Sequence, residues 1–367
     1  MLNDNKIAFI ICANNDLYLE ECIWYIDRLH IPSGYEVNII CITDAKSMAQ
    51  GYNAAMKSSD AKYKVYLHQD VFIRNACFLD EILGIFESGR EIGMIGVVGG
   101  NNLPADGVVY CAWNIGSVYC SNLAKTISVL YHQDRKCSWL EADAIDGMLM
   151  VTQYDIVWRE DLSLGWDFYD ISQSLEFVRR GYKIAVPFQA SPWCLHDSGH
   201  SKLIHYDEAR KQILKEYKEF FTEDFKPFVD TEILEIQENI FRVLKDFMEQ
   251  DMWEEALEIK KALQISRISD NDLQYALNMV DIYTAEEGME EGREGFFDNA
   301  GIWDEMKEKY DKIRFSLRRV EMVSDEDETR KLMALIRDNR ISRQAIEMIV
   351  RHSVIDRGKV LNRILKN

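Results

Sequence analysis

The chain reads Tyr63-Lys64-Val65-Tyr66-Leu67-His68-Gln69-Asp70 where an apolar run, typical of a buried strand, ends in an acid. Acids at the carboxyl ends of parallel strands line the crevice in which open α/β sheets bind ligands. A carboxylate there can hold a divalent cation against phosphate oxygens. A plain turn before a helix would also use an aspartate at this place. The stretch predicts an α/β sheet and makes Asp70 a candidate metal ligand.

Strand and helix patterns alternate around this stretch. Apolar runs at 7–12, 37–42 and 94–98 predict strands buried on both faces, and helical patterns occupy 16–29 and 47–57. Such alternation is typical of a mostly parallel sheet flanked by helices. Neither GxGxxG nor GxxxxGK[ST] follows the first strand, which argues against a dinucleotide site or a P-loop.

Composition narrows the class of protein. The 367 residues are 47% hydrophobic with a formal net charge of -19, which fits a globular protein and argues against binding nucleic acid or an anionic membrane. No stretch has the pattern of a signal peptide or the length of a transmembrane segment, so we expect a cytoplasmic protein. The eight Cys form no CxxC pair, and Cys12, Cys22 and Cys41 lie among apolar neighbours. We expect reduced core cysteines.

The chain changes character near residue 228. All five Pro and all eight Cys precede it, and apolar residues then recur at helical spacing, as in Leu234, Ile240, Leu244 and Phe247. Met333, Ile336, Ile341 and Ile346 suggest further stripes. We therefore expect an α/β domain at 1–228 and an all-α domain at 229–367. The helical domain could bind a protein partner or a second copy of the chain.

Four segments in order resemble a known family. They are Ile10-Ile11-Cys12-Ala13-Asn14-Asn15 with Leu19-Glu20-Glu21-Cys22, then Gly51-Tyr52-Asn53-Ala54, then Leu67-His68-Gln69-Asp70-Val71, and last Phe168-Tyr169-Asp170 through Arg179-Arg180-Gly181-Tyr182-Lys183 with His196. Over residues 6–201 the chain resembles family 2 glycosyltransferases of the GT-A fold, a Rossmann-like nucleotide-diphospho-sugar transferase fold. Within them it resembles the StrF-like branch, named for streptomycin biosynthesis.

The resemblance implies a metal site. Asp70 matches the metal-binding acid of the family's DxD motif, and His196 matches its distal ligand. The metal would be Mn²⁺ or Mg²⁺, and an imidazole ligand favours Mn²⁺. His68 stands where the family has the first acid, which contacts the donor's ribose or sugar. Asp197 could orient the His196 ring.

The same resemblance places the nucleotide-sugar donor and the acceptor. Ala13, Asn14 and Asn53 fall in donor-side segments, and Asp44 ends the second strand, where the nucleobase or ribose would be contacted; a turn acid would fit there as well.

On the acceptor side, Asp146 precedes an apolar strand and could contact the substrate or serve in a turn, and Trp166 could stack on a sugar. Asp170 is the candidate catalytic base and Asp167 its rival. Asp170 also stands at a probable helix start, where the helix dipole would lower its pKa.

Together these features predict a metal-dependent, inverting glycosyltransferase with a UDP-sugar donor, favoured over GDP- or dTDP-sugars, and a carbohydrate-containing hydroxyl acceptor. A sugar-nucleotidyltransferase would want a Gly-rich loop with Lys or Arg after the first strand, and Ala13-Asn14-Asn15-Asp16 has neither. A catalytically decayed sugar-nucleotide-binding or interaction module stays open because His68 replaces an acid. Metal-dependent binding of UDP, followed by a donor hydrolysis screen, separates these hypotheses.

Overall fold

The chain forms two compact units. The computed structural model describes residues 2–109, 112–121, 126–198, 205–222, 231–250, 252–262, 302–323, 325–338 and 350–354, with a few single positions between 273 and 280. Unit 1 comprises Met1–Tyr119, Ser128–Asp197 and Lys202–Val229, and unit 2 comprises Cys120–Ile127, Ser198–Ser201 and Asp230–Asn367. Two short stretches of the N-terminal sequence belong to the second unit.

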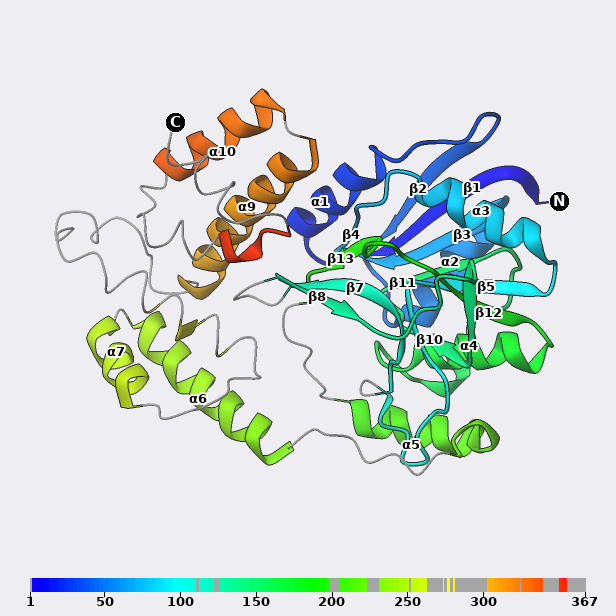
Figure 1. Cartoon of the computed structure of the whole chain (residues 1–367). Coiled ribbons are helices and arrows are strands. Elements are labelled where there is room, and N and C mark those ends of the chain that lie inside the picture. Colours follow the sequence, from blue (N-terminus) through cyan, green and yellow to red (C-terminus); the bar gives the residue numbers. More distant parts are fainter. Residues whose placement is uncertain are drawn as a thin grey trace. The chain divides into compact units, whose positions relative to one another are not determined.

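The main sheet of unit 1 has seven strands in the order β2-β1-β3-β11-β5-β12-β9. Their bounds are β1 (Asn3–Cys12), β2 (Glu36–Ile42), β3 (Ala61–His68), β5 (Ile92–Gly96), β9 (Trp139–Ala142), β11 (Leu149–Thr152) and β12 (Lys183–Pro187). Strand β1 is parallel to β2 and β3, and β12 is parallel to β5. Only β11 and β9 run against their neighbours. The expected mostly parallel sheet is confirmed (Figure 1).

A second, six-stranded sheet brings distant segments to the end of β3. It has the order β10-β6-β7-β13-β4, and β8 pairs with β7. The bounds are β4 (Val71–Ile73), β6 (Val98–Gly100), β7 (Ile115–Ser121), β8 (Thr126–Leu130), β10 (Ala144–Ile145) and β13 (Cys194–His196). In the antiparallel pair of β4 and β13, His196 stands opposite Val71. This register sets His196 beside the residue that follows Asp70.

Helices flank the sheets of unit 1 (Figure 1). They are α1 (Asp16–Ile26), α2 (Met48–Ser58), α3 (Phe78–Ser88), α4 (Tyr169–Arg179) and α5 (Tyr206–Glu216), with short 3₁₀ turns η2 (Glu160–Leu162) and η3 (Lys218–Phe220). The side chain of Asn15 caps α1 by accepting from the Tyr18 amide, and Ser47 caps α2 through the Gln50 amide. These caps fix where the first two helices begin, and both helices lie within the predicted ranges to within a few residues.

Two expectations about burial are wrong at the sheet edge. Strand β2 was expected to be buried on both faces, but it is the outermost strand and most of its residues are only partly buried. Cys41, on this strand, is exposed, whereas Cys12 and Cys22 are buried as expected. An apolar run does not reveal whether a strand will have one neighbour or two, and an edge strand keeps part of its surface in water.

Apart from the strand residues at 120–127, the elements described in unit 2 are helices. Its longer helices are α6 (Thr231–Glu249), α7 (Trp253–Ala262), α9 (Ile302–Val323) and α10 (Glu326–Asp338), with a 3₁₀ turn η5 (Val350–His352). Leu244 is buried and Ile240 and Phe247 pack against the same core, as predicted for these three members of the stripe on α6, whereas the side chain of Leu234 lies outside the described ones. Ile336 and Met333 of α10 contribute to that core too, whereas Ile341 and Ile346 lie outside the described residues.

Polar contacts join the strand residues of unit 2 to its helices. Arg318 of α9 donates to the Ser121 hydroxyl at 2.5 Å, and Arg314 pairs with Asp311 at 2.5 Å. These side chains are buried, so the contacts offset the cost of removing the charges from water. None of the helices in the described part of the chain has both the length and the apolar character needed to cross a membrane.

Candidate active site and metal centre

Three side chains of metal-binding type converge where β3 and β13 end. His68 is the last residue of β3, Asp70 follows it, and His196 is the last residue of β13. One ligand atom from each lies within 4.8 Å of the others. Asp70 Oδ1 is 3.8 Å from His68 Nδ1 and 3.6 Å from His196 Nε2. Sequence reasoning predicted Asp70 and His196 as ligands, whereas it placed His68 against the donor.

The state of these atoms suits a bound cation. Asp70 Oδ1 and His196 Nε2 are buried, and neither has a hydrogen-bond partner among the described residues. Buried polar atoms are usually paired, so two orphaned ligand atoms facing one another call for a further group between them. Burial raises the pKa of Asp70 to about 6 and lowers the pKa of both His68 and His196. Near neutral pH the set offers two neutral imidazoles and a largely ionised carboxylate, which fits a divalent transition-metal ion better than Mg²⁺.

Asp146 adds a second acid to this centre. Its backbone N–H donates to the Val98 carbonyl, and its Oδ1 accepts from the Met148 amide at 2.9 Å, so a tight turn holds the carboxylate. Its negative charge acts to raise the pKa of the metal-type ligands His68, Asp70 and His196. It acts in the same direction on the pKa of Asp170. Asp146 is therefore near enough to act electrostatically on His68, Asp70, His196 and Asp170.

Asp170 lies in the first turn of α4 and contacts the turn that follows Asp146. Its Oδ2 accepts from the Gly147 amide and its Oδ1 from its neighbour Ile171, both at 2.8 Å. We expected the helix dipole to lower its pKa, and this is wrong. Burial, reinforced by the charge of Asp146, raises the pKa of Asp170 to about 7 despite the two amide donors.

The rival acid lies in a different environment. Burial raises the pKa of Asp167, and the opposing charge effect on it comes from His205. Its amide donates to the Leu164 carbonyl in the loop before α4. Trp166, next to it, is 52% exposed, as a residue that contacts a large substrate could be.

Gln69, which sequence reasoning passed over, ties the predicted donor loop to the metal-type ligands. Its Oε1 accepts from the amides of Asn14 and Asn15, each at 3.0 Å, and its Nε2 donates to Asn14 Oδ1 at 2.6 Å. The amide of Ala13 donates to the carbonyl of Ile42 at the end of β2. In the sequence, the polar side chain of Gln69 between His68 and Asp70 was the feature that could have indicated this contact.

The remaining donor-side residues differ in exposure. Asp44 is exposed beyond the carboxyl end of β2, where a ligand can reach it. Asn53 is buried, and its amide exchanges hydrogen bonds with the backbone of Trp158 and donates to Glu160. These contacts give Asn53 a structural role and lend no support to the predicted donor contact.

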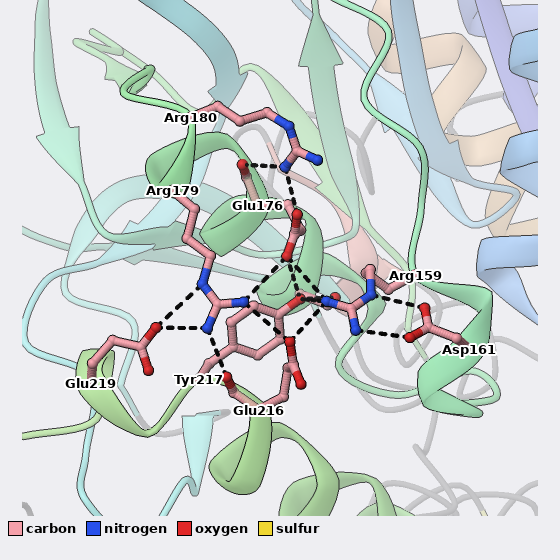
Figure 2. A network of polar contacts seen from close by, with 9 residues as sticks. Arg159, Asp161, Glu176, Arg179, Arg180, Glu216, Tyr217 and Glu219 are labelled. Atoms are coloured by element: carbon pink, nitrogen blue, oxygen red, sulfur yellow. Dashed lines mark hydrogen bonds and ion pairs between the residues drawn. The ribbon is translucent and has the colours of Figure 1, made fainter.

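A charged network anchors the far end of α4, the helix that carries Asp170. Glu176 accepts from Arg180 at 2.5 Å and from the Tyr217 hydroxyl at 3.0 Å, and Arg179 pairs with Glu219 at 2.6 Å (Figure 2). Arg159 joins the network through Glu176 and through carboxylates nearer the surface (Figure 2). The Arg179-Arg180 pair singled out in the sequence thus holds the helix in place.

The sheet topology, with acids and imidazoles gathered at the carboxyl ends of its strands, defines a GT-A α/β domain. A family model described as "Glycosyltransferase like family" matches residues 8–217, more than half of the chain. The chain belongs to this glycosyltransferase family.

The solved structures to which the chain is similar are distant from it. S. aureus TarS has a TM-score of 0.34 at 9% identity, with 98% of this chain and 55% of that chain covered. GalNAc-T7, solved with UDP, GalNAc and Mn²⁺, has a TM-score of 0.37 at 9% identity, with 60% of this chain and 50% of that chain covered. The mannosyltransferase PcManGT from Pyrobaculum calidifontis, in complex with GDP-Man and Mn²⁺, has a TM-score of 0.32 at 10% identity, with 100% of this chain and 87% of that chain covered.

The match spans about half the length of the first two of these proteins. No curated protein sequence matches this chain. The family assignment rests on the family-model match over residues 8–217.

Proposed function

We propose that the protein is a metal-dependent glycosyltransferase that moves a sugar from a nucleoside diphosphate donor to a carbohydrate hydroxyl with inversion at C1. The observation that carries this proposal is the pair of orphaned, facing ligand atoms, Asp70 Oδ1 and His196 Nε2, close to a half-buried acid whose pKa is about 7. The resemblance to the StrF-like branch favours UDP as the nucleotide, and we expect the enzyme to act in the cytoplasm.

Asp170 has the properties of the base. An inverting transfer needs a carboxylate that takes the acceptor's proton while the acceptor oxygen bonds to C1 and the bond from C1 to the diphosphate breaks. A base with a pKa near the working pH is both ionised in a useful fraction and basic enough to accept the proton. Its contact with Gly147 keeps it next to Asp146, whereas the charge effect on Asp167 comes from His205. We therefore prefer Asp170.

Asp70 and His196 would hold the divalent cation, together with His68. When bound, the cation supplies positive charge that offsets the charge of the departing nucleoside diphosphate. The protein's net charge of -19 makes such screening necessary for an anionic donor. Asn14 and Ala13, fixed by Gln69 and β2, and the exposed Asp44 would line the nucleotide side. Asp146 and Trp166 would contact the acceptor.

Calorimetric titration of UDP with and without Mn²⁺ tests the proposal. We expect binding that requires the metal and is lost in Asp70→Ala. Asp4→Ala is the matched control, since Asp4 is an exposed acid in β1 far from its carboxyl end. Binding of UDP that is equal without metal and in Asp70→Ala would contradict the assignment. Metal-dependent binding with no hydrolysis of any nucleotide-sugar would instead indicate a decayed, ligand-binding domain.

A further inference from the structure

The two ring nitrogens of His68 have different surroundings. Nε2 forms a short hydrogen bond with the hydroxyl of Tyr169, and Nδ1 faces Asp70 Oδ1 at 3.8 Å. A neutral imidazole carries one proton, and only the nitrogen without it can bind a metal. If Nδ1 is the ligand atom, the proton must sit on Nε2 and needs an acceptor. The phenolic oxygen of Tyr169 is that acceptor.

We infer that His68 is a third protein ligand of the metal centre, through Nδ1, and that Tyr169 is the positioning residue that fixes its tautomer and ring orientation. Metal-binding histidines commonly donate their second N–H to a fixed oxygen in this way. The inference deepens the proposed function, because it rests on the metal site formed by Asp70 and His196. It replaces the donor contact expected of His68 with a metal contact.

The surroundings of Tyr169 keep its hydroxyl in place. Tyr169 is buried among aromatic side chains, with ring centroids 5.9 Å from Tyr52 and 6.2 Å from Trp158. Gly147 passes so close that a Cβ there would collide with the Tyr169 hydroxyl and stand 2.9 Å from the Asp170 Cβ. Because residue 147 has no side chain, the Tyr169 hydroxyl can occupy this space and contact His68.

The backbone before Tyr169 points to the same constraint. Phe168 has a φ of 53° and is buried, although bulky residues rarely take this left-handed conformation. Such a residue persists only where its surroundings determine it. Here it sets the start of α4, and with it the direction in which Tyr169 and Asp170 project.

A set of two imidazoles and one carboxylate has a consequence for metal choice. Mg²⁺ is usually bound by oxygen atoms, whereas imidazole suits transition metals. We therefore expect Mn²⁺ or Co²⁺ to bind and to support activity at lower concentrations than Mg²⁺.

Direct binding of Mn²⁺, without any turnover, tests the inference. Electron paramagnetic resonance titration of the full chain with UDP present gives the metal affinity, and the nitrogen modulation of the spin echo reports coordinated imidazoles. Tyr169→Phe should weaken Mn²⁺ binding about 10- to 100-fold, the usual loss when a ligand's supporting partner is removed. Tyr52→Phe is the matched control, because its buried hydroxyl has no partner among the described residues. It should bind Mn²⁺ like the wild type.

A second variant separates ligation from folding. His68→Ala should reduce the nitrogen modulation from that of two imidazoles to that of one, whatever the stability of Tyr169→Phe. Unchanged modulation in His68→Ala, or wild-type Mn²⁺ affinity in Tyr169→Phe, would overturn the inference and leave the proposed function standing if UDP binding still requires metal. If the wild type binds no Mn²⁺ with or without UDP, the inference and the metal-dependent function both fail.

Discussion

Replacing Asp170 by Asn tests the proposed chemistry. The amide keeps the size of the side chain and one acceptor for the amides of Gly147 and Ile171, but it cannot take a proton. We expect the transfer rate to fall by about 10²- to 10⁴-fold, the usual contribution of a general base. Asp167→Asn should stay within a few-fold of the wild type, because the charge effect on that acid comes from His205 and not from Asp146.

The pH dependence gives this prediction its magnitude. With a pKa of about 7 for Asp170, about a tenth of the molecules hold the ionised base at pH 6 and about nine tenths at pH 8. The wild-type kcat/KM should therefore rise about tenfold over that interval, and this limb should vanish in Asp170→Asn. A nearly full rate in Asp170→Asn with a collapse in Asp167→Asn would move the base to Asp167, and full rates in both would refute the mechanism.

Stability provides the control for misfolding. The folded-state pKa of Asp170 lies above the value near 3.9 expected in the unfolded chain, so the native state holds the proton more tightly. This group's contribution to stability is therefore present at low pH and is lost as pH rises through the window from about 4 to about 7. Asn does not titrate, and Asp170→Asn should melt no lower than the wild type at pH 8. A lower melting temperature there would show that lost folding, not lost chemistry, explains the lost rate.

Three further perturbations follow from the contacts of the site and its support. Gly147→Ala should weaken Mn²⁺ binding and destabilise the fold by about 1 to 3 kcal/mol, since the new methyl collides with the Tyr169 hydroxyl; a variant with unchanged melting and metal affinity would contradict the crowding. Glu176→Gln should lower the free energy of unfolding in urea by about 1 to 3 kcal/mol, because it weakens the charged network on α4, and an unchanged midpoint would show that network to be dispensable. Trp166→Ala should raise the KM for a carbohydrate acceptor about three- to tenfold while donor affinity and melting stay unchanged; an unaltered acceptor KM would remove Trp166 from the acceptor site.

Much of the fold could be predicted from local patterns. The apolar runs before Cys12 and His68 became central strands of the main sheet that are parallel to each other. The order of segments in the resembled family also allowed Asp70 and His196 to be paired before the register of β4 and β13 was known.

The failures concern properties set by distant neighbours. The edge position of β2 depends on strand order, which its own residues do not encode. The sign of the pKa change at Asp170 depends on burial and on the charge of Asp146, which outweigh the backbone amides of Gly147 and Ile171. His68 and Tyr169 are far apart in sequence, so their contact could not be read from either segment alone.

The clamp formed by Gln69 implies thermodynamic linkage between donor and cation. The segment His68-Gln69-Asp70 carries the metal ligand Asp70, and its Gln69 side chain accepts hydrogen bonds from the amides of Asn14 and Asn15. A nucleotide that orders the Asn14 loop would therefore also order the carboxylate, and each partner should tighten the other's binding by the same factor. Gln69→Ala should keep both the nucleotide loop and the metal ligands but remove the contact between them. The affinities for nucleotide and for cation should then no longer depend on each other.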